Sequence, residues 1–450
     1  MSRPNVVLLL ADQMRGQATG YAGDPNVETP HLDRLAAESV NMTNAVSNCP
    51  ICTPYRASLM TGQYPLTHGL FLNDLCLPTS DDSLGCIFAR HGYDTAYIGK
   101  WHLDGHGRST YIPAERRQGF DYWNVLECTH DYNHSYYYAG ASDQKRVWEG
   151  YDAYDQTADA VRWLSDRKGE DNPFFLMVSY GPPHNPYDTA PPEQKAKYQA
   201  DSLVLRDNVA PELEAKARGD LVGYYAHISA LDECVRRVDE ALESNGLRDN
   251  TVFIFTSDHG DSMESHCDPD YPGVNKQRPY EESIIVPLLI RGPGLRPRSE
   301  PTLIAGVDLM PTLLGLCNLP IPAEVEGTSY APLLRGEAMI SRDAVLVAGY
   351  APFADWRPER GGRAFRGIRT ERYTYARDLS GPWLLFDNRR DPYQLRNLVD
   401  DASSAGLRVE LELLLAEELT RRDDMFLPPS ELLQQWGYEV DERGCVPYAN

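Results

Sequence analysis

Cys52 stands at the start of a segment whose residue types favour an anionic nucleophile. Pro54 and Gly62 are typical of the first turn and of the end of a helix, so Cys52 is expected at the positive N-terminus of a short helix. The helix dipole and Arg56, one turn further on, would both stabilise an anion there. Two other interpretations are open: a buried structural cysteine, and a redox or zinc role shared with Cys49. The second lacks further ligands at zinc-binding spacing.

Polar residues that could bind an ion follow four apolar, strand-like runs, at 6–10, 97–98, 174–178 and 252–255. The polar residues that follow these runs in the sequence are Asp12, Lys100, His102, His184 and Asp258. Amphipathic stretches at 29–40, 155–168 and 220–245 are predicted as helices. Apolar strands that alternate with helices indicate an α/β fold, with a mainly parallel central sheet buried on both faces. Because ligands of such sheets sit beyond the carboxyl ends of the strands, we expect the polar residues to meet there.

The chain changes character after residue 336. Short strands are predicted at 344–349, 365–370, 373–377 and 383–386, followed by a helix at about 405–422. We therefore expect a catalytic α/β domain at 1–336 and a smaller C-terminal domain at 337–450. The smaller domain would contain an antiparallel sheet, the helix, and a tail from 426 onward that wraps the surface.

The bulk composition excludes some partners. A formal charge of -23 over 450 residues argues against nucleic acid, which requires a basic surface. The longest apolar run near the start is too short to span a membrane and does not form a signal peptide. We expect a cytoplasmic protein, or a periplasmic or secreted one if a presequence has been removed. The nine scattered cysteines do not form a typical disulfide framework, so most are expected to be reduced and buried.

The nucleophile segment resembles the maturation signal of the type I sulfatases, members of the alkaline phosphatase superfamily. That signal is Cys-x-Pro-x-Arg with a Thr-Gly a few residues on, and it is matched by Cys52, Pro54, Arg56 and Thr61-Gly62. The resemblance implies that a separate maturase converts Cys52 to formylglycine. It further implies that one hydroxyl of the aldehyde hydrate attacks a sulfate ester and that the other later expels sulfate. The resemblance therefore predicts a sulfuric ester hydrolase.

Two further segments, Asp12-Gln13 and Asp258-His259, resemble the metal-ligand pairs of this family. Together with Cys52, they would bind one divalent cation, for which Ca²⁺ is expected, with Mg²⁺ or Mn²⁺ as alternatives. The usual family pairs are Asp-Asp and Asp-Asn, so Gln13 and His259 are departures. They resemble the choline-sulfatase and phosphonate-monoester-hydrolase branches. A phosphonate monoester or phosphate diester hydrolase that uses the same site is therefore the alternative function.

Four more residues resemble the sulfate-binding set of the family. Lys100 and His102 match its Gly-Lys-x-His segment. His184 matches a histidine that contacts the leaving oxygen, and Lys276 matches the last lysine of the set. With Arg56, these residues would neutralise charge on the sulfate oxygens, and His184 would protonate the leaving oxygen. The alternatives are a surface lysine and histidine, and a loop histidine with only a packing role.

The segment 127–138 is rich in hydrogen-bonding and aromatic residues and could line a sugar site. Its candidate substrate contacts are His130, Asp131 and His134. Arg278, outside this segment, is a further candidate because it lies two residues from Lys276 and could serve in its place. A polar surface loop without a ligand is the alternative for this segment. We expect a sulfate ester of a small molecule or oligosaccharide as the substrate, with a carbohydrate favoured. The alternative of another class is a non-catalytic binder of anionic glycans in which Cys52 stays a thiol.

Overall fold

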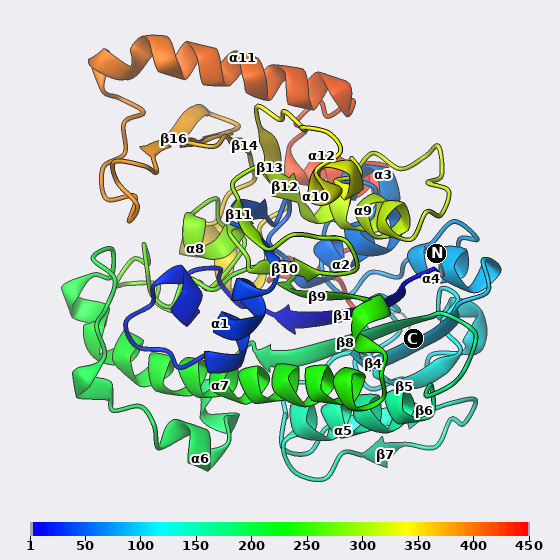
Figure 1. The fold of residues 1–450 in the computed structure, drawn as a ribbon. Helices are drawn as coiled ribbons and strands as arrows, with labels where there is room; N and C mark the ends of the chain where they lie inside the picture. The colour runs from blue at the N-terminus through cyan, green and yellow to red at the C-terminus, as the bar shows by residue number, and fades with distance from the viewer. Residues whose placement is uncertain (1–2, 449–450) are drawn as a thin grey trace.

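The computed structural model describes residues 3–448 and contains a ten-stranded central sheet (Figure 1). In spatial order its strands are β11 (Arg298–Glu300), β2 (Val40–Met42), β10 (Leu288–Arg291), β9 (Thr251–Ser257), β1 (Asn5–Asp12), β8 (Phe174–Pro183), β4 (Asp94–Lys100), β5 (Tyr122–Leu126), β6 (Tyr136–Ala139) and β7 (Arg146–Val147). The central strands β9, β1, β8, β4 and β5 run parallel, whereas β10 and β6 join this group antiparallel. The predicted α/β fold with a mainly parallel sheet is confirmed.

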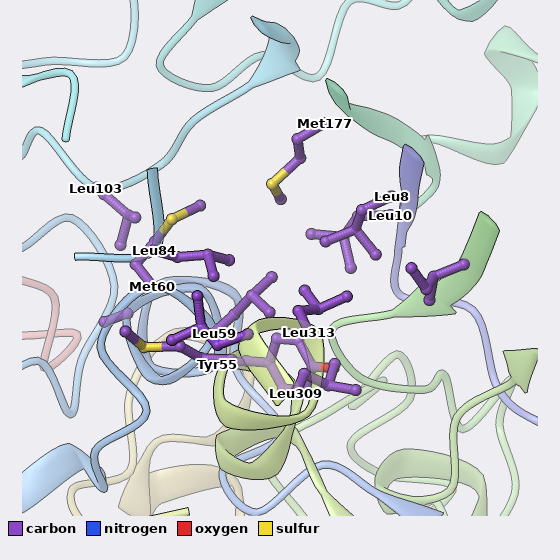
Figure 2. Close-up of a cluster of buried hydrophobic side chains, with 14 of the residues drawn as sticks. Leu8, Leu10, Tyr55, Leu59, Met60, Leu84, Leu103, Met177, Leu309 and Leu313 are labelled. Carbon is purple, nitrogen blue, oxygen red and sulfur yellow. The ribbon is translucent and has the colours of Figure 1, made fainter. Parts of the chain in front are cut away.

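Helices cover both faces of the sheet because side chains along a buried strand alternate between two cores. Leu8 and Leu10 of β1 belong to one core, and Val7 and Leu9 belong to the other. The first core, part of which Figure 2 shows, packs against α2 (Cys52–Thr61), α4 (Leu84–Arg90) and α9 (Leu309–Leu316). The second packs against α1 (Pro30–Ala37), α5 (Asp152–Ser165) and α7 (Glu214–Ser244). With both faces covered, the polar residues that follow the parallel strands meet beyond the carboxyl ends of those strands.

A four-stranded antiparallel sheet lies near the C-terminus, as predicted. It consists of β13 (Val345–Gly349), β14 (Phe365–Arg369), β15 (Tyr373–Asp378) and β16 (Gly381–Asp387), and α11 (Ala405–Arg421) packs on it. The division at 336/337 stays a prediction. The tail contains an unpredicted helix, α12 (Pro429–Trp436), whose Trp436 ring lies 6.2 Å from that of Phe71. The proline at its start and Gly437 at its end were the available sequence signals.

The remaining regular elements are short. They are α3 (Pro65–His68), α6 (Pro192–Lys195), α8 (Glu281–Ile284), α10 (Ala331–Arg335), and the paired strands β3 (Ala45–Val46) and β12 (Ile304–Ala305). The three amphipathic stretches predicted as helices correspond to α1, α5 and α7, but α7 begins at Glu214 rather than at 220. Within residues 3–448, no helix combines the length and the apolar character needed to cross a bilayer.

Candidate active site

Cys52 lies at the N-terminus of α2, close to Asp12 at the end of β1. Its side chain is buried, and its Sγ atom lies 3.2 Å from His259 Nε2, 3.2 Å from Lys276 Nζ and 3.5 Å from Asp12 Oδ1. Burial and Asp12 raise the pKa of this thiol, but Lys276, Lys100 and His259 outweigh them and hold it well below its usual range. The surroundings of residue 52 therefore favour an anion.

Four buried side chains from three segments could share one metal ion. The ligand atoms of Asp12, Cys52, Asp258 and His259 all lie within 4.8 Å of one another. Burial and the neighbouring Asp12 raise the pKa of Asp258, because two carboxylates here share a site without solvent. A divalent cation would relieve this repulsion, and carboxylate oxygens are ligands that such ions prefer. The residues present therefore fit a divalent cation.

Gln13 and His259, the two departures from the usual pairs, each keep one atom available to such an ion. Gln13 Nε2 donates to Asp261 Oδ2 at 2.7 Å, which orients the amide, and its buried Oε1 has no hydrogen-bond partner among residues 3–448. His259 Nδ1 lies 2.9 Å from the carbonyl oxygen of Gly260. We therefore expect the ring proton on Nδ1 when an ion is bound, with Nε2 available as the ligand atom. Both residues would then offer neutral ligand atoms.

Arg56 and Lys100 neutralise the two carboxylates. Arg56 Nη2 lies 3.1 Å from Asp12 Oδ2 and 3.2 Å from Asp258 Oδ2, and Lys100 Nζ lies 2.5 Å from Asp12 Oδ2. Burial opposes ionisation of Asp12, but Lys100 and its other cationic neighbours hold the pKa of Asp12 well below its usual range. Arg56 Nη1 also donates to Ser179 Oγ at 2.7 Å. Because its guanidinium is occupied in this way, Arg56 is better placed to position the carboxylates than to contact sulfate.

His102 lies next to the nucleophile segment and is held by a carboxylate that sequence reasoning missed. Its Nε2 lies 3.1 Å from Asp74 Oδ1, and Arg108 Nη2 lies 3.2 Å from Asp74 Oδ2. The backbone carbonyl of His102 accepts a hydrogen bond from Thr53 Oγ1 at 2.9 Å. No strand or helix pattern marks Asp74 or Arg108 in the sequence, because both lie in irregular segments.

His184 and Lys276 are in direct contact. His184 Nε2 lies 3.0 Å from Lys276 Nζ, and its Nδ1 lies 2.7 Å from the carbonyl oxygen of Asn185. Burial and then Lys276 lower the pKa of His184 well below its usual range. The ring is therefore neutral, with its proton on Nδ1, and Nε2 accepts from the ammonium group of Lys276. The acid role of His184 stays a prediction.

Segment 127–138 approaches the site through one of its predicted contacts. The His130 ring stacks on that of His184, with centroids 5.0 Å apart and planes 11° from parallel. Asp131 and His134 are exposed, and His134 packs edge-on against Tyr136, with ring centroids 5.2 Å apart. The geometry thus brings His130 to the catalytic residues, and it leaves Asp131 and His134 on the surface.

Arg278 does not fit the substrate-binding role suggested by its position in the sequence. Its side chain is buried, and its guanidinium donates to the carbonyl oxygens of His266, Ser265 and Val274 and to Ser262 Oγ, at 2.6 to 2.9 Å. With its Nη1 and Nη2 groups bonded in this way, Arg278 holds residues 262–278 together. The position of Arg278 two residues after Lys276 in the sequence did not predict that its side chain is buried.

Comparisons with known proteins agree with the fold and the site. The family model described as Sulfatase matches residues 4–319, and the model described as N-sulphoglucosamine sulphohydrolase, C-terminal, matches residues 272–421. An ulvan-active sulfatase of Formosa agariphila is 44% identical over 451 residues, which cover 99% of this chain and 87% of that protein. An endo-4-O-sulfatase of Bacteroides thetaiotaomicron is 35% identical, with 88% of each chain covered.

Solved structures show the same architecture. A Bacteroides thetaiotaomicron 4S-sulf protein, described with the metabolism of multiple glycosaminoglycans, superimposes with a TM-score of 0.84. It is 32% identical, and the match covers 96% of this chain and 99% of that one. The phosphonate monoester hydrolase of Agrobacterium radiobacter shares the fold, with a TM-score of 0.75 at 24% identity and full coverage of both chains. The family match over residues 4–319 and the sequence identities show that the chain belongs to the sulfatase family, whose members hydrolyse sulfate esters.

Proposed function

We propose that this sulfatase acts on carbohydrate sulfate esters, with formylglycine made from Cys52 by a separate maturase as its nucleophile. The observation that carries the proposal is the position of Cys52. It starts α2, and its Sγ lies 3.2 Å from both Lys276 Nζ and His259 Nε2, within the cluster of potential metal ligands that it forms with Asp12, Asp258 and His259. The names of two relatives, an ulvan-active sulfatase and an endo-4-O-sulfatase, support a glycan as the substrate.

The residues around position 52 can divide the work of ester cleavage. Formylglycine would supply an aldehyde hydrate, of which one hydroxyl attacks sulfur and the other later expels sulfate. Lys100 and Lys276 flank this position and would attract the sulfate oxygens on which charge accumulates. As the bond between sulfur and the leaving oxygen breaks, the contacting pair of His184 and Lys276 would deliver a proton to that oxygen.

We infer that the divalent ion of this site is Ca²⁺. Asp12, Asp258 and the Oε1 atom of Gln13 are hard oxygen ligands, which suit Ca²⁺ and Mg²⁺. A buried cluster made of protein ligands favours Ca²⁺, because Mg²⁺ usually keeps several of its waters. The imidazole of His259 leaves Mn²⁺ as the alternative. Bound here, the ion would act as a Lewis acid toward a sulfate oxygen.

A substrate panel tests the proposed function against its two alternatives. We expect purified enzyme to desulfate oligosaccharides prepared from ulvan, and to prefer aryl sulfates over aryl phosphonates and phosphate diesters by about 100-fold or more in kcat/KM. Release of sulfate and of nitrophenol is measured under one set of conditions. A preference for the phosphorus esters would contradict the sulfatase proposal. Binding of sulfated glycan without any release of sulfate, by protein whose Cys52 is still a thiol, would indicate the non-catalytic binder.

His184→Ala tests the predicted proton donation to the leaving oxygen. We expect kcat/KM for a sugar sulfate to fall by about 10²- to 10⁴-fold, because an alcohol leaves poorly without a proton. The loss with 4-nitrophenyl sulfate should be much smaller, since nitrophenolate leaves without help. His91→Ala, at the C-terminal end of α4 and remote from the site, is the matched control. Equal losses on both substrates would remove the acid role from His184.

A further inference from the structure

A pocket of about 510 Å³ lies next to the candidate active site. Asn185 and Asn275 line it, and each is the chain neighbour of a catalytic candidate, His184 or Lys276. Those two candidates contact each other at 3.0 Å between Nε2 and Nζ. The volume lies within the range of about 300–1,000 Å³ that is typical of ligand pockets. The pocket is therefore large enough for a ligand and adjoins the reacting centre.

A chain of hydrogen bonds joins the wall of this pocket to the metal-ligand cluster. Asn275 Nδ2 donates to Tyr187 Oη at 3.0 Å, and Tyr187 Oη donates to Asp261 Oδ2 at 2.6 Å. The same carboxylate oxygen accepts from Gln13 Nε2 at 2.7 Å. Because these contacts are buried or partly buried, the pocket wall and the cluster hold a fixed relative position.

Several polar groups of the pocket have no protein partner among the described residues. These groups are Asn185 Nδ2, Asn275 Oδ1 and the Asp188 carboxylate, while the Lys195 ammonium donates only to the Asp188 carbonyl oxygen, at 2.8 Å. Amide, carboxylate and ammonium groups together offer donors and acceptors at close range, which suits the hydroxyl groups of a sugar.

The charges around the pocket disfavour a second sulfate group. Asp188, Asp220 and Asp355 contribute three carboxylates to the lining, against the ammonium groups of Lys195 and Lys216, and Arg360, outside the lining, pairs with Asp355 at 3.2 Å. Lys216 is already paired with Asp220 and with Glu264, an acid outside the lining. A hydroxyl-rich unit without its own negative charge therefore fits better than another anion.

Helix α7 lines one side of the pocket and leaves open space at one of its positions. Gly219 lines the pocket on this helix, and a Cβ added there would meet no atom within 4 Å. We propose that the pocket binds an unsulfated neighbouring sugar unit of the glycan whose sulfate ester reacts at position 52. This inference rests on the proposed glycan substrate. The pocket would then affect how well longer glycans bind, and it would not affect the cleavage of the sulfate ester itself.

Gly219→Leu tests the pocket because it fills the space without changing a catalytic residue. We expect KM for a sulfated ulvan oligosaccharide to rise about tenfold, while kcat/KM for 4-nitrophenyl sulfate stays within about twofold. Gly219→Ala keeps most of the space and should behave like the unaltered protein. Gly406→Leu, at another helical glycine with open surroundings, controls for the general effect of leucine at such a position.

Binding of a desulfated oligosaccharide separates this inference from the proposed function. Isothermal titration should detect binding by the unaltered protein and by Gly406→Leu, with about tenfold weaker binding by Gly219→Leu. Equal binding by all three proteins, or no binding by any, would overturn the pocket assignment even if sulfated oligosaccharides are hydrolysed. If the unaltered protein releases no sulfate from any glycan, the proposed function fails, whereas a Gly219-dependent binding signal would still support the pocket.

Discussion

Replacing Cys52 with alanine is expected to lower kcat/KM for sulfate esters by at least about 10⁴-fold, because the nucleophile acts as a unit with its surroundings. The free energy of unfolding should change by only about 1 kcal/mol, since a small buried side chain is shortened by one atom. Both quantities are measurable on the same preparation, by sulfate release and by denaturant unfolding. A large kinetic loss with a small stability change would assign a chemical role to residue 52.

Cys49→Ala is the matched control for this prediction. Cys49 is buried three residues before Cys52, and burial raises the pKa of its thiol above the usual range. We expect this variant to keep nearly full activity. Mass spectrometry of the peptide that contains Cys52 should show a loss of about 18 Da in protein made alongside its maturase, as conversion to formylglycine requires. Turnover by Cys52→Ala at a near-normal rate would contradict the proposed mechanism.

Much of the site could be predicted from the rule that ligands bind beyond the carboxyl ends of parallel strands. This rule needs only the positions of the strands in the sequence and of the polar residues that follow them. Asp12, Lys100 and Asp258 each follow a run of apolar residues, and parallel strands bring such positions to one edge of the sheet. The ion pairs that join Asp12 to Lys100 and Arg56 confirm that the ends of β1 and β4 and the start of α2 meet. For these residues, the same sequence pattern predicted both the fold and their closeness in space.

The residues that the sequence did not indicate act through partners that are distant in the chain. Asp261 orients Gln13 from 248 positions away, and Asp74 holds His102 from 28 positions away. Neither contact has a periodic pattern that could predict it. Arg278 shows the opposite error, because its position in the chain suggested the substrate and its side chain turns to buried carbonyl groups. Which way a loop side chain points is decided by packing, and spacing alone does not contain that information.

The departures at Gln13 and His259 change the charge of the metal-ligand cluster. A set with Asp-Asp and Asp-Asn pairs would contribute three carboxylates, whereas this chain contributes two, Asp12 and Asp258, with a neutral amide and a neutral imidazole. The carboxylate of Asp261 lies behind Gln13 and accepts its Nε2 hydrogen at 2.7 Å. The Asp261 side chain would thus lie one contact away from a bound ion, where its hydrogen bond with Gln13 orients the amide oxygen.

Removal of the divalent ion by a chelator is expected to abolish turnover and to destabilise the fold. Without the ion, Asp12 and Asp258 lie close together in a buried site, where Arg56 Nη2 contacts both carboxylates, at 3.1 and 3.2 Å. We expect kcat to fall by about 10³-fold or more, because the sulfate oxygens lose their strongest counter-charge. At 100 times its dissociation constant, an added ion should restore about 2.7 kcal/mol of stability. Ca²⁺ should restore both properties at lower concentration than Mg²⁺ or Mn²⁺.

Thermal denaturation of two variants tests whether the stabilising ion binds at the candidate active site. In Asp258→Asn, added Ca²⁺ should no longer raise Tm, because one of the two anionic ligands is lost. Asp104→Asn is the matched control, since Asp104 belongs to a second cluster of potential ligands, with Cys76 and His106, but its carboxylate is already paired with Arg116 at 2.6 Å. This variant should respond to Ca²⁺ like the unaltered protein. If the Ca²⁺ response disappears in Asp104→Asn and persists in Asp258→Asn, the ion binds at the cluster of Cys76, Asp104 and His106 instead. Full activity after chelation would exclude a catalytic ion.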